Sequence, residues 1–164
     1  MVRAKTVAGA AGAVFLVLQL VPVYPRENPP ARPEATIESH LEVSPPVKTI
    51  LDRSCRDCHS DETRWPWYSG VAPVSWLIVR DVEKARSIMN FSRWSDGAGK
   101  KLELAVGMLA ASCSDVTVGR MPKPDYAFLH SEAKLNKADI AAFCAWSKSE
   151  GKRLLIARRK KAAN

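Results

Sequence analysis

The segment Cys55-Arg56-Asp57-Cys58-His59 contains two cysteines that are separated by two residues and followed directly by a histidine. This spacing is typical of covalent haem attachment. On one helical turn, both thiols can reach the two vinyl groups of a single porphyrin and form thioethers, and the adjacent imidazole can bind the iron. The segment therefore predicts one covalently bound haem c, with Cys55 and Cys58 as attachment sites and His59 as an axial iron ligand.

The residues before this segment predict a helix that carries it. Ser44 is a favourable N-cap, and Pro45 suits the first helical position. Small and apolar residues then recur with helical spacing, at Val47, Ile50, Leu51, Ser54, Cys55 and Cys58. The attachment segment is thus expected at the end of an amphipathic helix, which places the haem edge against the core.

Further helices are predicted from residue 73 to about 89, from 100 to 118, and from 136 onward. Apolar residues recur every three or four positions in each stretch. In the first stretch the expected inward face consists of Val74, Leu77, Ile78, Val82, Ala85, Ile88 and Met89. Asn136, with Asp139 three residues later, marks the start of the last helix. No segment predicts a strand, so we expect an all-α fold, a small helical domain like that of c-type cytochromes around one haem, with its first and last helices crossing at the haem edge.

The N-terminus has the pattern of a signal or membrane anchor. Arg3 and Lys5 precede an apolar run from Val7 to Val23. The bulky residues 20–25 lack a small-residue cleavage pattern, which favours an uncleaved transmembrane anchor over a removed signal peptide. Basic residues on the N-terminal side predict that the remainder lies in the periplasm, at the inner membrane of a bacterium.

Composition divides the rest of the chain. Residues 1–24 are the predicted anchor, 25–44 a proline-rich tether, 45–151 the haem-binding domain, and 152–164 a basic tail. The net charge of +8 comes from eight basic residues near the two ends, and the middle is neutral. We interpret the tail as a solvated end, and no recognition module indicates nucleic-acid binding.

The second axial ligand is predicted at Met121. Met121-Pro122 follows Gly119 in a loop after a predicted helix, and the proline restricts the backbone beside the sulfur. A thioether opposite a histidine raises the reduction potential of a haem. His130 is the alternative ligand, and otherwise it is a residue near the site or on the surface.

An aromatic segment follows the attachment motif. Arg64, Trp65, Trp67 and Tyr68 lie within five positions, and Pro66 prevents a regular helix there. These side chains are candidates to wall the haem and to hydrogen-bond its propionates. Ordinary packing of a loop explains the same pattern, and both interpretations remain open.

Cys113 and Cys144 fall on the inward faces of the last two predicted helices. In an oxidising compartment they can form a disulfide, which would close a loop that contains Met121. Two buried free thiols are the alternative.

Several blocks of the sequence resemble a known family. They are residues 55–60, 63–69 and 71–77, then Asn90-Phe91-Ser92 with Trp94, and Met121-Pro122 with Tyr126 and His130. Over residues 45–147 the chain resembles the haem-binding domain of membrane-anchored bacterial c-type cytochromes. The resemblance implies haem attachment at Cys55 and Cys58 and ligation by His59. It also adds Trp76 and Tyr126 as candidates for the haem pocket.

The predicted function is single-electron transfer by a monohaem c-type cytochrome, with an unidentified redox partner protein and no enzymatic activity. Two filled axial positions leave no site for a substrate. A gas or redox sensor and a peroxidase that uses His130 are alternatives. A zinc site formed by Cys55, Cys58, His59 and Cys113 is a further one.

Overall fold

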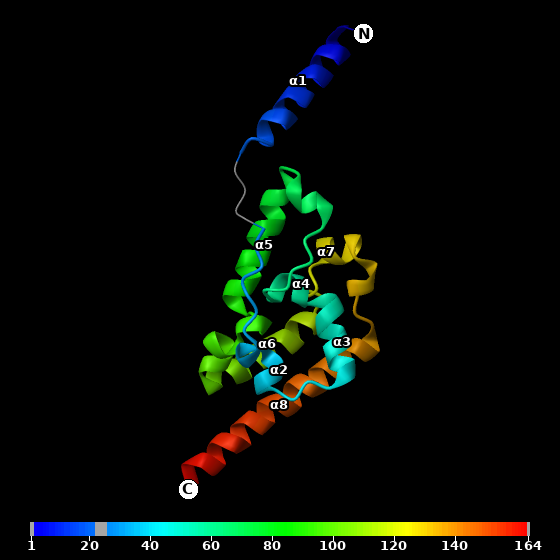
Figure 1. The fold of residues 1–164 in the computed structure, drawn as a ribbon. Coiled ribbons are helices and arrows are strands. Elements are labelled where there is room, and N and C mark those ends of the chain that lie inside the picture. The colour runs from blue at the N-terminus through cyan, green and yellow to red at the C-terminus, as the bar shows by residue number, and fades with distance from the viewer. Residues whose placement is uncertain (1, 22–25, 164) are drawn as a thin grey trace.

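The computed structural model describes residues 2–21 and 26–163, which contain helices and no strand (Figure 1). The expected all-α fold is confirmed. The α-helices are α1 (Val2–Leu18), α2 (Ile37–His40), α3 (Pro45–Ser54), α4 (Arg56–His59), α5 (Val74–Ile88), α6 (Leu102–Thr117), α7 (Pro124–Leu129) and α8 (Lys137–Ala163). Short 3-10 helices are η1 (Pro33–Ala35), η2 (Trp67–Gly70), η3 (Phe91–Asp96), η4 (Ala98–Lys100) and η5 (Ser131–Ala133).

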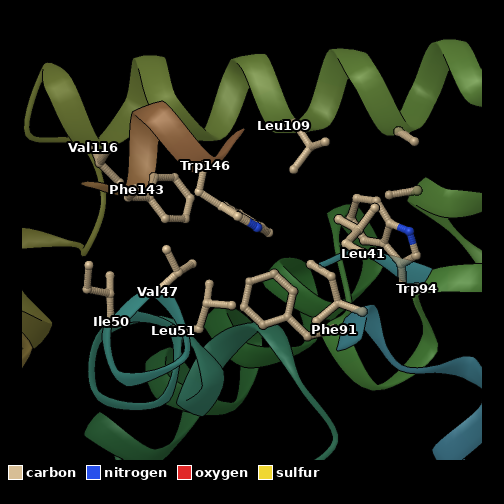
Figure 2. Close-up of a cluster of buried hydrophobic side chains, with 13 residues drawn as sticks. Leu41, Val47, Ile50, Leu51, Phe91, Trp94, Leu109, Val116, Phe143 and Trp146 are labelled. Atoms are coloured by element: carbon tan, nitrogen blue, oxygen red, sulfur yellow. The ribbon is translucent and has the colours of Figure 1, made fainter. Parts of the chain in front are cut away.

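The hydrophobic core lies where α6 and α3 pack against α8. Figure 2 shows Phe143 and Trp146 of α8 facing Val47 and Leu51 of α3. Each buried side chain of this size contributes roughly 1.5–3 kcal/mol to folding. Phe91, from η3, belongs to the same cluster, so the core extends to the segment beside the attachment motif.

Helix α3 has the predicted start and the predicted inward face. Ser44 is its N-cap residue and Pro45 its first residue, and its buried residues are Val47, Ile50, Leu51 and Ser54. The helix does not continue through the motif, because Cys55 leaves helical geometry at φ −130°. The motif therefore occupies a separate turn, α4, rather than the end of α3.

Helix α5 begins at Val74, as predicted, but its inward face is rotated from the predicted one. Ser75, Val79, Val82 and Ala85 are buried. Val74 and Leu77, which we expected in the core, are 42% and 51% exposed. They face a cavity that α5 shares with α4 and α7.

Glycine and a capping pair set the helix ends on either side of α7. Gly119 has φ +72°, a left-handed conformation that ends the run of α6 and favours glycine. Before α8, the Asn136 side chain accepts a hydrogen bond from the Asp139 N–H, and the Asp139 carboxylate accepts one from the Asn136 N–H, both at 2.9 Å. The predicted capping pair is confirmed.

The N-terminal helix α1 stands apart from the helical body (Figure 1). Its end is fixed by Gln19, whose side-chain amide bonds both the carbonyl and the N–H of Ala72, at 3.1 and 3.0 Å. None of the helices in the described ranges is both long enough and apolar enough to cross a membrane. The predicted transmembrane anchor is therefore not shown, and its residues 22–24 lie outside the described residues.

The predicted tether is only partly extended. Pro33–Ala35 forms η1 and Ile37–His40 forms α2, and Ile37 and the following Leu41 are 1% and 3% exposed in the core. An extended proline-rich linker is the wrong description of this stretch, because its apolar residues complete the core. His40 hydrogen-bonds the carbonyl of Glu34 at 3.1 Å.

The basic tail is helical: residues 152–163 form the C-terminal part of α8. Arg153 pairs with Glu150 at 2.6 Å, and Arg158 pairs with Glu103 of α6. These contacts explain why the end of α8 stays ordered although most of its side chains are exposed.

The predicted disulfide is present. Cys113 of α6 is bonded to Cys144 of α8, and their Cα atoms are 4.9 Å apart. The bond joins the two helices that pack most extensively and closes the loop that contains Met121 and α7.

Replacing Cys113 and Cys144 together by Ser should lower the free energy of unfolding by about 3–4 kcal/mol. The reason is that the disulfide, which joins residues 31 positions apart, no longer restricts the unfolded chain. Denaturant unfolding monitored by circular dichroism measures the change. Equal unfolding midpoints for the variant and the oxidised wild type would contradict the expectation.

Candidate functional site

The attachment motif is a single helical turn that begins at Cys55. The Cys55 carbonyl accepts hydrogen bonds from the N–H groups of Cys58 and His59, at 3.2 and 2.9 Å. Both cysteines are free thiols and partly buried. Burial raises the pKa of Cys55 to about 12 and that of Cys58 to about 11, so both are protonated at neutral pH.

His59 is held by hydrogen bonding to the backbone at the end of α5. Its Nδ1 lies 3.0 Å from the carbonyl oxygen of Met89, which can only accept, so Nδ1 carries the proton. Burial lowers the pKa of His59, which keeps the imidazole neutral. Its ring also lies 5.9 Å from that of Phe91. A neutral histidine whose other ring nitrogen donates to a carbonyl is the usual arrangement of a metal ligand.

A cavity of about 250 Å³ opens beside Cys58, between α4, α5 and α7. Its apolar wall comes mainly from α5, with Leu129 of α7 opposite. The apolar lining residues on α5 are Val74, Leu77, Ile78 and Val82. The polar lining residues are Asp57, Thr63, Arg64, Tyr68, Asp81, Lys123, Asp125, Tyr126 and His130. The site thus combines an apolar face with charged groups at its edge, as small-molecule sites generally do.

Asp57, inside the motif, connects α4 to the aromatic loop and to α7. Its carboxylate accepts bonds from Arg64 Nε and from the Arg64 Nη2, both at 3.0 Å, and from the Tyr126 hydroxyl at 2.8 Å. Burial alone would raise the pKa of Asp57, but these hydrogen bonds hold it below its usual value. The ionised carboxylate therefore fixes both neighbours at neutral pH.

His130 lies in the cavity wall within an aromatic group. Its Nε2 is 2.7 Å from the Tyr68 hydroxyl, and its ring stacks on Tyr126 at 4.4 Å. Its Nδ1 lies 3.4 Å from the Glu132 carboxylate. Both ring nitrogens of His130 therefore have partners within the protein.

The structure brings some of the predicted pocket residues together and separates others. Arg64, Tyr68 and Tyr126 line the cavity with Cys58. Trp65 lies beneath Arg86, whose guanidinium carbon is 5.9 Å from the ring centre, and Trp67 is 82% exposed. The indole N–H groups of Trp65 and Trp76 are buried and have no acceptor among the described residues.

Met121 is not part of the cavity wall. It is 36% exposed, and its backbone N–H donates to the Asp115 carbonyl at 3.2 Å. Lys123, two residues later, does reach the cavity and pairs with Asp81 of α5. Ligation of iron by Met121 stays a prediction.

The alternative zinc site is excluded by the disulfide, because Cys113 is bonded to Cys144 and has no thiolate to offer. Over the described ranges, no group of three or more metal-ligating side chains is gathered.

Sequence reasoning missed three contributors to this site. Lys123 and Asp81 form an ion pair across the cavity, and the Met89 carbonyl orients His59. Lys123 is adjacent to the Met-Pro signal and could have been suspected. A backbone carbonyl carries no signal in the sequence, because every residue has one.

An all-helical domain with a neutral histidine beside two reduced cysteines and an apolar cavity defines a cofactor-binding protein. The chain belongs to the haem-binding domain family, which it matches over residues 13–149. The match supports haem as the ligand, and it begins well before the domain boundary that we predicted at residue 45. Comparison with curated proteins and with solved structures gives no match.

In the haem-free protein, both motif thiols should react with iodoacetamide about 100-fold more slowly at pH 8 than in urea, since burial raises their pKa values by two or more above the usual value. The rate should rise steadily above pH 9. Mass spectrometry after timed alkylation measures it. Equal rates in folded and unfolded protein would contradict the burial of these groups.

Proposed function

We propose that this protein is a monohaem c-type cytochrome that carries single electrons. The observation that supports this most directly is the neutral His59, whose Nδ1 is hydrogen-bonded to the Met89 carbonyl and which directly follows a pair of reduced cysteines in the motif. Bound haem supplies a reversible one-electron couple between ferric and ferrous iron. The protein contributes covalent attachment, an axial nitrogen and control of the surroundings.

Cys55 and Cys58 would hold the haem through thioethers, formed when each protonated thiol adds across one vinyl group. The raised pKa values of both cysteines agree with this role. In the proposed site the sulfurs bind the vinyl carbons and not a metal, so neither cysteine has to be ionised. His59 would provide the axial nitrogen. Its hydrogen bond to Met89 increases the basicity of the ring and fixes its orientation.

The cavity beside Cys58 would enclose part of the macrocycle. Its α5 wall offers apolar contact, and Arg64 and Lys123 offer cations to the propionates. These residues together suit an amphipathic planar group with two carboxylates.

We further propose a periplasmic location, with α1 serving as signal or anchor. The disulfide between Cys113 and Cys144 supports an oxidising compartment. Ligation of the second axial position by Met121 would leave no open site, which favours electron transfer over catalysis or gas sensing.

Absorption spectra of oxidised and reduced protein, produced with a haem-maturation system, test the proposal. We expect c-type bands and pigment that stays with the protein on a denaturing gel. The matched control is Cys55→Ala with Cys58→Ala, which should lose the covalent pigment. Colourless wild-type protein, or pigment released by boiling in detergent, would refute it.

Replacing Met121 by Leu should lower the reduction potential, by an amount of order 0.1 V within the ~0.8 V range that axial ligands control, because the thioether no longer stabilises ferrous iron. The same variant should bind carbon monoxide rapidly. Potentiometric titration and flash photolysis measure the two effects. Met108→Leu, on α6, is the matched control and should change neither; rapid binding by the wild type would argue against a filled sixth position.

A further inference from the structure

The C-terminal end of α5 carries one buried arginine with an unusually complete set of partners. The Arg86 side chain is 15% exposed. Its Nε donates to the Ser60 carbonyl at 2.8 Å, and its Nη1 donates to the Glu27 carbonyl at 3.0 Å. Its Nη2 donates to Asn28 Oδ1 at 2.9 Å and to Thr63 Oγ1 at 2.8 Å. Four of its five N–H groups are thus used.

These bonds join three separate parts of the chain. Residues 27–28 come from the N-terminal segment, residues 60–63 follow directly after His59, and Arg86 itself belongs to α5. Asn28 closes the arrangement, because its amide also donates to the Thr63 carbonyl at 2.9 Å. The loop after the motif is therefore held between α5 and a segment that precedes it by more than thirty residues.

The same end of α5 also holds the ring of His59. Met89 lies one turn beyond Arg86, and its carbonyl accepts the Nδ1 hydrogen bond of His59 at 3.0 Å. Arg86 donates a hydrogen bond to the carbonyl of Ser60, the residue that directly follows His59. Arg86, in the last turn of α5, and Met89, the residue that ends the helix, thus control His59, Met89 through the ring and Arg86 through the adjacent backbone.

We propose that Arg86 is a positioning residue for His59, and that Asn28 completes the same clamp. This inference rests on the proposed function, in which His59 binds iron. The clamp keeps the carbonyl of Met89 aligned with the Nδ1 proton and so sets the strength of the axial nitrogen. Residues 27–28 are then part of the site rather than part of a linker.

The geometry requires the planar fork of arginine and not simply a positive charge. A lysine at this position has one terminal nitrogen and cannot reach the carbonyls of Ser60 and Glu27 together with the Asn28 and Thr63 oxygens. Asp61, 3.9 Å from Arg86 Nε, has its own partners in Arg93 and Asn90, at 2.5 and 2.7 Å. Charge neutralisation of Asp61 therefore does not depend on Arg86 alone.

Arg86→Lys in the haem-loaded protein tests the proposal, because it keeps the charge and removes the fork. We expect the His59 Nδ1 proton to exchange with water about tenfold faster or more, since its acceptor is less firmly placed. We also expect a higher reduction potential, because a less basic imidazole stabilises ferric iron less well. Nuclear magnetic resonance of the ferrous protein and potentiometry measure the two effects.

Arg80→Lys is the matched control, because Arg80 lies on the same helix with its side chain 68% exposed and has only a 3.6 Å contact with Asp81. It should change neither quantity. Asn28→Ala should shift both in the same direction as Arg86→Lys, by less. If Arg86→Lys keeps the wild-type exchange rate of the Nδ1 proton and the wild-type reduction potential, the clamp is overturned. If the wild-type protein itself carries no covalent haem, the proposed function is overturned instead.

Discussion

The hydrogen bond from His59 to the Met89 carbonyl is the contact on which the site depends. It fixes the tautomer of the imidazole and ties the attachment turn α4 to the end of α5. Burial against Phe91 keeps the ring neutral, and Phe91 belongs to the main core. The packing of α3, α6 and α8 therefore reaches the candidate iron ligand through Phe91 and through Met89, which packs against the same core.

Arg56 and Asp57, the two residues between the cysteines, connect the motif to neighbouring segments, a role that the motif alone does not specify. Arg56 is largely buried and pairs with Asp52, Glu62 and Glu38, the last on α2. Asp57 holds Arg64 and Tyr126, and so brings the aromatic loop and α7 to the cavity. Each charge is partnered, which partly offsets the cost of removing it from water. The motif is thus docked by its variable residues on both sides.

The α5 helix has two roles on two faces. Ser75, Val79 and Ala85 pack into the protein, Val74 and Leu77 turn toward the cavity, and the buried Val82 lies between the two faces and also lines the cavity. The sequence pattern cannot distinguish these faces, because both are apolar. One face packs against the protein core, and the other faces the cavity proposed for the haem. The same ambiguity explains why the predicted inward face of α5 was rotated from the observed one, whereas that of α3 was correct.

The sequence by itself determined the elements whose signals are local: the attachment motif, the start and inward face of α3, the Asn136–Asp139 cap and the end of α6 at Gly119. It left a disulfide between Cys113 and Cys144 as one of two alternatives, and the packing of α6 against α8 decided between them. Tertiary structure decided what depends on distant contacts. It alone placed Ile37 in the core, chose the Met89 carbonyl as the partner of His59, and brought Asn28 to Arg86. Helix signals arise from neighbouring residues, whereas hydrogen bonds between segments tens of residues apart depend on how the whole chain packs.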